Sequence, residues 1–110
     1  MSDKLKKRIG IFSGTFDPIH NGHVHFAQEA IRLCGLDKVF FMVEPEPRRK
    51  QAVKAVEHRV RMAQLAIAKQ PKLGLIVLEH HQFTPKGTLP ILLKRFEGAE
   101  LYMLMGDDML

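Results

Sequence analysis

The residues best suited to chemistry lie in one glycine-bearing loop, GTFDPIHNGH, at residues 14–23. It holds two imidazoles three positions apart, His20 and His23, between an apolar run and a helix-like run. Backbone N–H groups and the dipole at a helix start favour an anion, and small residues allow close approach of the backbone. The loop therefore predicts phosphate binding and phosphate chemistry. The alternative for either histidine is a helix-capping or core role.

Two widespread phosphate loops are absent, because the sequence has neither G-x-x-x-x-G-K-[ST] nor G-x-G-x-x-G after its first apolar run. HNGH at residues 20–23 instead resembles the H-x-G-H signature of the nucleotidyltransferase superfamily. The full ten-residue string most closely resembles the nicotinate-nucleotide adenylyltransferase branch. This resemblance implies that His20 and His23 are catalytic, contacting nucleotide phosphates and stabilising charge in the transition state.

The resemblance also implies binding residues beyond the histidines. The implied nucleotide contacts are Gly14, Thr15, Phe16, Lys50, Gly106 and Asp108. For Phe16, a core role is an equal alternative. Phe83 and Thr84 match the family's pyridine pocket, with Phe83 in place of the more usual tyrosine. Lys50 follows Arg49, where the family usually has a histidine.

The activity implied is adenylyl transfer from ATP to nicotinate mononucleotide, giving deamido-NAD and pyrophosphate, with Mg²⁺ arriving on the ATP. The runner-up is a sibling transferase acting on another phosphate, such as phosphopantetheine. A non-enzyme alternative is an inactive nucleotide-binding or assembly module, because the family's second, Ser/Thr-rich motif has no match here. The chain looks truncated after its fourth predicted strand. Two alternatives stay open: a fragment, or a short form that pairs with a partner. An open sheet edge or helix-binding face there carries a risk of aggregation or of self-association as a homo-oligomer.

Apolar periodicity predicts the elements that position these residues. Strands are expected at residues 9–12, 38–43, 73–78 and 101–105, and helices at 24–33, about 53–67, and from an N-cap at Thr88 to near Gly98. Gly35 is expected to cap the first helix. This β-α-β-α-β-α-β order predicts a Rossmann-like parallel sheet with helices on both faces. Because ligands bind at the carboxyl ends of such strands, loops 13–23, 44–52, 79–88 and 106–108 should meet at one cleft.

The bulk composition limits the class of protein. With 110 residues and 45% hydrophobic residues, a single domain spanning 1–110 is expected. The apolar runs are too short to span a bilayer, and the lone Cys34, expected to be packed, fits a reducing cytoplasm. The net charge of +5 suits anionic ligands, but one Tyr and no Trp argue against nucleic-acid binding.

Two further segments have chemical side chains to which we assign no catalytic role. His80 and His81 are adjacent, so they point apart in an extended chain, and no third ligand is evident; no metal site is predicted. Residues 57–63 match the family's second helix and are assigned to packing and surface.

Overall fold

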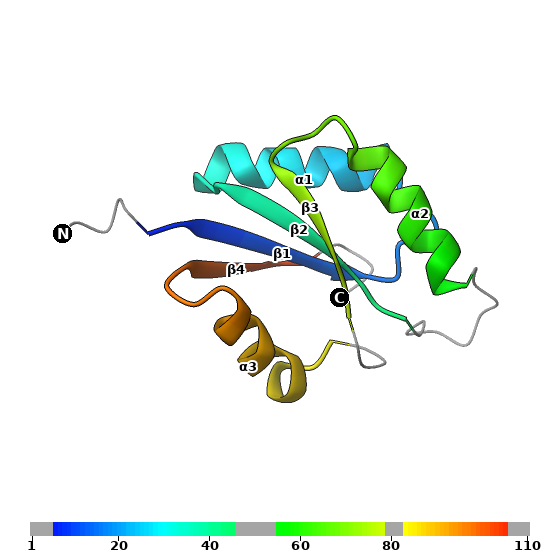
Figure 1. The fold of residues 1–110 in the computed structure, drawn as a ribbon. Helices are drawn as coiled ribbons and strands as arrows, with labels where there is room; N and C mark the ends of the chain where they lie inside the picture. The colour runs from blue at the N-terminus through cyan, green and yellow to red at the C-terminus, as the bar shows by residue number, and fades with distance from the viewer. Residues whose placement is uncertain (1–5, 46–54, 79–82, 106–110) are drawn as a thin grey trace.

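The computed structural model describes residues 6–45, 55–78 and 83–105. Strands and helices alternate along these residues (Figure 1). The elements are β1 (Arg8–Gly14), α1 (Asn21–Cys34), β2 (Lys38–Val43), α2 (Val56–Ile67), β3 (Leu73–Val77), α3 (Pro85–Arg95) and β4 (Glu100–Leu104). The predicted β-α-β-α-β-α-β order is confirmed.

The strands form one parallel sheet in the order β3-β2-β1-β4. β1 is central, and Ile11 at its middle pairs with Phe40 of β2 and Met103 of β4. Helices α1 and α2 cover one face and α3 covers the other (Figure 1), so the predicted two-sided covering is confirmed. The strand order reverses between β1 and β4, which is where ligands enter open sheets of this kind.

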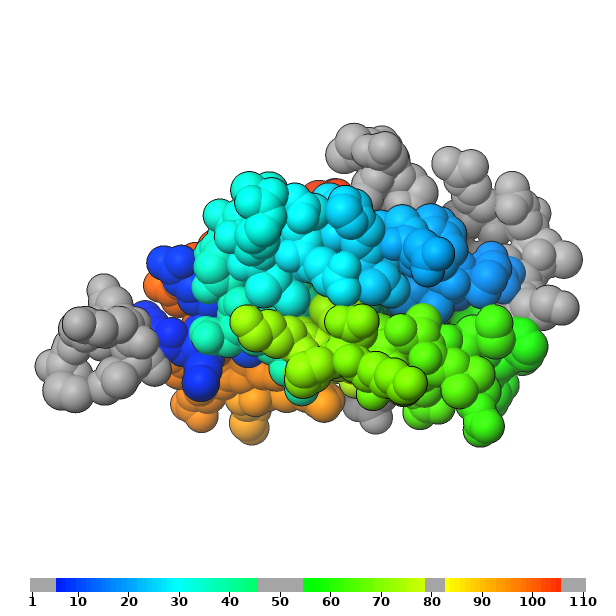
Figure 2. All heavy atoms as spheres, turned by 90° about the horizontal axis from the view of Figure 1, so that it is seen from above, coloured from blue at the N-terminus to red at the C-terminus, as the bar shows by residue number. Residues whose placement is uncertain are grey.

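The core is divided by the sheet, because successive side chains of a strand point to opposite faces. On one face, Phe12 and Phe41 pack with Ala27 of α1 and Ala63 of α2. Figure 2 shows α1 and α2 side by side over this face. The other face packs against α3 through a second cluster: Ile9, Ile11, Met42, Ile76, Leu78 and Leu92. None of the helices in the described ranges combines the length and apolarity that crossing a membrane requires.

Helix α1 begins earlier than the sequence pattern indicates. It starts at Asn21 rather than at residue 24, because His20 supplies a side-chain N-cap that apolar periodicity does not detect. Its predicted C-cap is confirmed: Gly35 has a φ of 64° and donates its N–H to the carbonyl of Ile31. Cys34, the last helical residue, is exposed, so the expectation of a packed thiol is wrong.

Helix α3 is capped by a different threonine from the one predicted. Thr84, not Thr88, is the N-cap, and its hydroxyl accepts the N–H of Gly87 at 3.0 Å. Pro85 takes the first helical position, which suits its fixed φ and missing N–H. Pro90 therefore lies inside the helix rather than in its first turn, and the helix ends at Arg95 rather than near residue 98.

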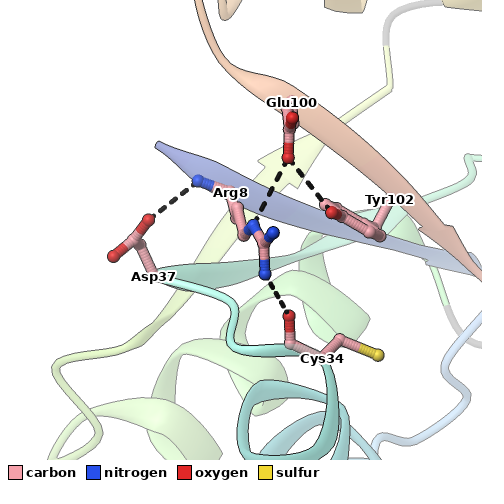
Figure 3. Close-up of polar contacts among 5 residues, drawn as sticks. All are labelled: Arg8, Cys34, Asp37, Glu100 and Tyr102. Carbon is pink, nitrogen blue, oxygen red and sulfur yellow. Dashed lines mark hydrogen bonds and ion pairs between the residues drawn. The ribbon is translucent and has the colours of Figure 1, made fainter. Parts of the chain in front are cut away.

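Polar contacts join the amino ends of the strands, opposite the predicted ligand edge (Figure 3). The Arg8 backbone N–H donates to Asp37, and its guanidinium donates to the carbonyl of Cys34 and pairs with Glu100 at 3.3 Å. Tyr102 donates its hydroxyl to the same carboxylate at 3.1 Å. Arg8 thus ties β1 to β4 and to the end of α1.

Candidate active site

The two histidines of the H-x-G-H tetrad cap helix α1, just beyond the carboxyl end of β1. Nδ1 of His20 accepts the N–H of Gly22, and Nδ1 of His23 accepts the N–H of His20, both at 3.0 Å. These reciprocal bonds form a capping box, and the two rings stack with centroids 3.8 Å apart. The capping alternative weighed from the sequence is therefore correct for the Nδ1 atoms.

The capping box engages only the Nδ1 atom of each imidazole, and Nε2 lies outside it. A nitrogen that accepts a hydrogen bond carries no proton, so each neutral ring holds its proton on Nε2 and presents an N–H there. The side chain of His20 is exposed and that of His23 is half-buried. No acidic side chain occupies the first turn of α1, residues 21–24, so the positive helix end is not neutralised locally. This arrangement suits an anion.

Gly22 is required by the cap itself. A Cβ at this position would lie 2.8 Å from Cε1 and 3.0 Å from Nδ1 of His20. The ring can fold back over the first turn only because that volume is empty. The packing of the His20 ring therefore explains why the third residue of the tetrad is glycine, which sequence spacing alone does not reveal.

Phe16 belongs to the core rather than to an exposed ligand surface. Its side chain is 5% exposed, and its φ of 50° is uncommon outside glycine. The ring meets His23 edge-on, with centroids 5.0 Å apart and planes at 89°. A Cβ on Gly14 would lie 3.1 Å from this ring, so the missing side chain of Gly14 makes room for Phe16. Nucleotide contact by the backbone of these residues stays a prediction.

Arg59 contacts the loops of the candidate site, whereas the sequence pattern assigns residues 57–63 to packing and surface. Its side chain is 1% exposed. The guanidinium donates to the carbonyls of Thr15 at 2.7 Å, Glu44 at 2.8 Å and Pro45 at 2.6 Å. Burial lowers the pKa of Arg59, opposed by the charges of Asp17 and Glu57.

One sequence signal could have located Arg59. The buried positions of α2 are Arg59, Ala63 and Ile67, which recur every four residues. A cation at that spacing lies on the buried stripe and must find hydrogen-bond acceptors there. Apolar spacing alone predicts an inner face of Val53, Val56, Val60, Ala63 and Ile67, which passes over Arg59; in the structure Val56 and Val60 are half-buried.

Glu44 links the loop after β2 to both neighbouring loops. It is fully buried, and its backbone N–H donates to the carbonyl of Gly14 at 2.9 Å. Its carboxylate accepts the N–H of Phe83 at 2.5 Å. The described parts of the loops after β1, β2 and β3 therefore meet at the carboxyl edge of the sheet, as predicted.

Phe83 lines a cavity of about 400 Å³ at the reversal point between β1 and β4. The rest of the lining is Ser13, Pro85, Leu89, Met103, Leu104 and Met105. This lining is mainly apolar and could accept a flat ring. Thr84, the partner of Phe83 in the predicted pyridine pocket, is exposed and uses its hydroxyl to cap α3.

Three predicted nucleotide contacts lie outside the described residues: Lys50, Gly106 and Asp108. Arg49, His80 and His81 lie outside them as well. Within residues 6–45, 55–78 and 83–105, no group of three or more His, Cys, Asp and Glu side chains could hold a metal ion.

Comparison with known proteins places the chain in a family. The model of the family described as cytidylyltransferase-like matches residues 11–110. The nicotinate-nucleotide adenylyltransferase of Bacillus subtilis (strain 168) is 38% identical over 109 residues, covering 94% of this chain. A probable nicotinate-nucleotide adenylyltransferase of Neisseria meningitidis serogroup C (strain 053442) is 40% identical over 109 residues, again covering 94% of this chain. The chain spans 58% and 55% of the lengths of these two relatives.

A solved structure supports the fold independently. Plasmodium falciparum nicotinic acid mononucleotide adenylyltransferase complexed with NaAD superposes with a TM-score of 0.73 at 21% identity. The superposition covers 88% of this chain and 50% of the other. At that identity the likeness establishes the shared architecture alone.

Proposed function

Because this chain belongs to the cytidylyltransferase-like family, we propose that it carries the chemistry of adenylyl transfer from ATP to nicotinate mononucleotide, yielding deamido-NAD and pyrophosphate. The capped and stacked pair of His20 and His23 is the observation that carries the proposal. The names of the relatives from Bacillus subtilis and Neisseria meningitidis support the choice of substrate. We place the reaction in the cytoplasm, where both nucleotides are available.

The reaction needs positioning and charge stabilisation more than a strong base. The phosphate of the mononucleotide is already anionic near neutral pH, and it attacks the α-phosphorus of ATP in line with the departing pyrophosphate. In the proposal, Nε2–H groups of His20 and His23 and the amino end of α1 donate to the phosphoryl oxygens as charge builds. Mg²⁺ enters as part of the ATP substrate and supplies charge neutralisation.

We assign the remaining binding roles to the loops around this pair. The backbone of residues 14–16 and the predicted contacts Lys50, Gly106 and Asp108 hold the nucleotide. The cavity lined by Phe83 receives the pyridine ring, since its volume of about 400 Å³ and its apolar walls suit a flat heterocycle. A nicotinamide ring would fit the same walls, and Phe83 lacks the hydroxyl of the more usual tyrosine.

The proposal is tested by measuring pyrophosphate release from ATP and magnesium with one acceptor at a time. We expect turnover with nicotinate mononucleotide and none with phosphopantetheine, and the rate with nicotinamide mononucleotide measures how well the cavity distinguishes the two rings. Turnover with phosphopantetheine alone would identify the sibling transferase. Nucleotide binding without turnover on any acceptor would identify the inactive module. Size-exclusion chromatography of the same sample tests for a homo-oligomer.

A further inference from the structure

We propose that Arg59 is a positioning residue that holds the histidine loop at a fixed distance from the ring cavity. Its guanidinium and the carbonyls of Thr15, Glu44 and Pro45 form what we call the Arg59 cluster. The catalytic part of this inference rests on the proposed function, whereas the structural part can be measured without it.

The Arg59 cluster joins two loops through backbone atoms. Thr15 follows β1, whereas Glu44 and Pro45 follow β2, so one side chain from α2 bonds to the segments that follow both strands. A guanidinium is planar and carries several donors in a rigid fork, so it can serve several carbonyls at once. A buried cation is tolerated only when such bonds replace its hydration.

Each side of the Arg59 cluster leads to part of the proposed site. On the β1 side, Thr15 precedes Phe16, whose ring supports the ring of His23 edge-on at 5.0 Å between centroids. On the β2 side, the Glu44 carboxylate accepts the backbone N–H of Phe83 at 2.5 Å, and Phe83 lines the cavity. Movement at Arg59 would therefore change the separation between the imidazoles and the pocket for the ring.

The test compares Arg59→Met and Arg59→Lys with Ile67→Ala. Ile67 lies on the same buried stripe of α2, eight residues after Arg59, and packs in the apolar core, so its truncation lowers stability without removing the guanidinium that donates to the three carbonyls. Lysine keeps the positive charge but lacks the planar set of N–H donors of a guanidinium. If Arg59→Met does not fold, the same measurements on Arg59→Lys therefore still test the inference.

The first measurement is hydrogen exchange, which requires no substrate. Loss of the Arg59 cluster should speed exchange about tenfold at the backbone N–H groups of Gly22 and Glu44, through local opening of the two loops. In Ile67→Ala, the exchange rates of these two amides should change no more than those of the other amides in the protein. Equal protection of both amides in Arg59→Lys, Arg59→Met and wild type would overturn the inference.

The second measurement separates kcat from KM at a temperature where every variant is folded. Arg59→Lys should lower kcat about 100-fold, as expected for reactants misplaced by about an ångström, with a much smaller change in KM for ATP. Ile67→Ala should keep the wild-type kcat. An active wild type whose kcat is unaffected in Arg59→Lys would overturn the catalytic part. A wild type without turnover would refute the proposed function, and hydrogen exchange would still decide the positioning.

Discussion

Replacing His20 by asparagine separates its two uses, capping and chemistry. Asparagine is among the best N-cap residues, and its side-chain oxygen can accept the N–H of Gly22 as Nδ1 of His20 does at 3.0 Å. It has no group equivalent to Nε2–H at the far side of an imidazole. His20→Asn should therefore keep the start of α1 and lose the proposed phosphate donor, whereas His20→Ala should lose both.

The expected magnitudes differ enough to be resolved. Losing the cap in His20→Ala should cost about 1 kcal/mol of folding free energy, or about 4 °C in Tm for a chain of this size. His20→Asn should unfold within about 1 °C of wild type on the same scale. Losing one preorganised donor should lower kcat about 100- to 1,000-fold, equivalent to about 2.7–4 kcal/mol, in both variants.

The assay pairs thermal unfolding with pyrophosphate release from ATP and nicotinate mononucleotide. His25→Ala is the matched control, because His25 is an exposed histidine of the same helix outside the capping box. It should keep the wild-type kcat. A His20→Asn protein with the wild-type kcat would refute the reasoning, since His20 would then serve only as a cap.

Three further predictions concern Gly22 and Ser13 near the candidate site and Tyr102 at the opposite edge of the sheet. Gly22→Ala gains about 1 kcal/mol of helix propensity, but its Cβ would lie 2.8 Å from the His20 ring and disturb the cap, which offsets that gain. Tm should therefore stay near wild type, whereas kcat should fall about tenfold or more because the His20 ring is displaced. An unchanged kcat would contradict the steric role of this glycine. The hydroxyl of Ser13 is buried and has no hydrogen-bond partner among the residues that the structure describes. Ser13→Ala should therefore leave stability unchanged or raise it by up to about 1 kcal/mol in denaturant unfolding, and a clear loss would show that the hydroxyl is satisfied. The hydrogen bond to Glu100, then burial, raises the pKa of Tyr102 above 10.0. As the only tyrosine of the sequence, Tyr102 can be titrated directly by phenolate absorbance. The stability that this shift contributes is present below about pH 10 and is lost as pH rises through the folded-state pKa. Glu100→Ala should lower the midpoint of the phenolate titration of Tyr102. An unchanged midpoint would exclude the hydrogen bond to Glu100 as the cause of the raised pKa.

Local patterns in the sequence were sufficient to predict the architecture. Alternating apolar runs gave the parallel sheet with helices on both faces, and Gly35 marked the end of α1, because strand and helix periodicity and terminal glycines act over a few neighbouring residues. The same locality explains why the HNGH loop could be found. It also explains the errors at helix starts, since apolar spacing does not register side-chain caps such as His20 and Thr84.

Contacts between distant residues were decided only by the tertiary structure. Arg59 reaches the carbonyl of Thr15, 44 positions away, and Glu44 reaches Phe83, 39 positions away. Sequence spacing cannot show which charges are buried, because burial depends on which loops the sheet topology brings together. Roles for Lys50, Gly106 and Asp108 stay predictions. The sequence by itself therefore determined which loop is predicted to bind a phosphate, and only packing across the sheet decided which buried charges contact that loop.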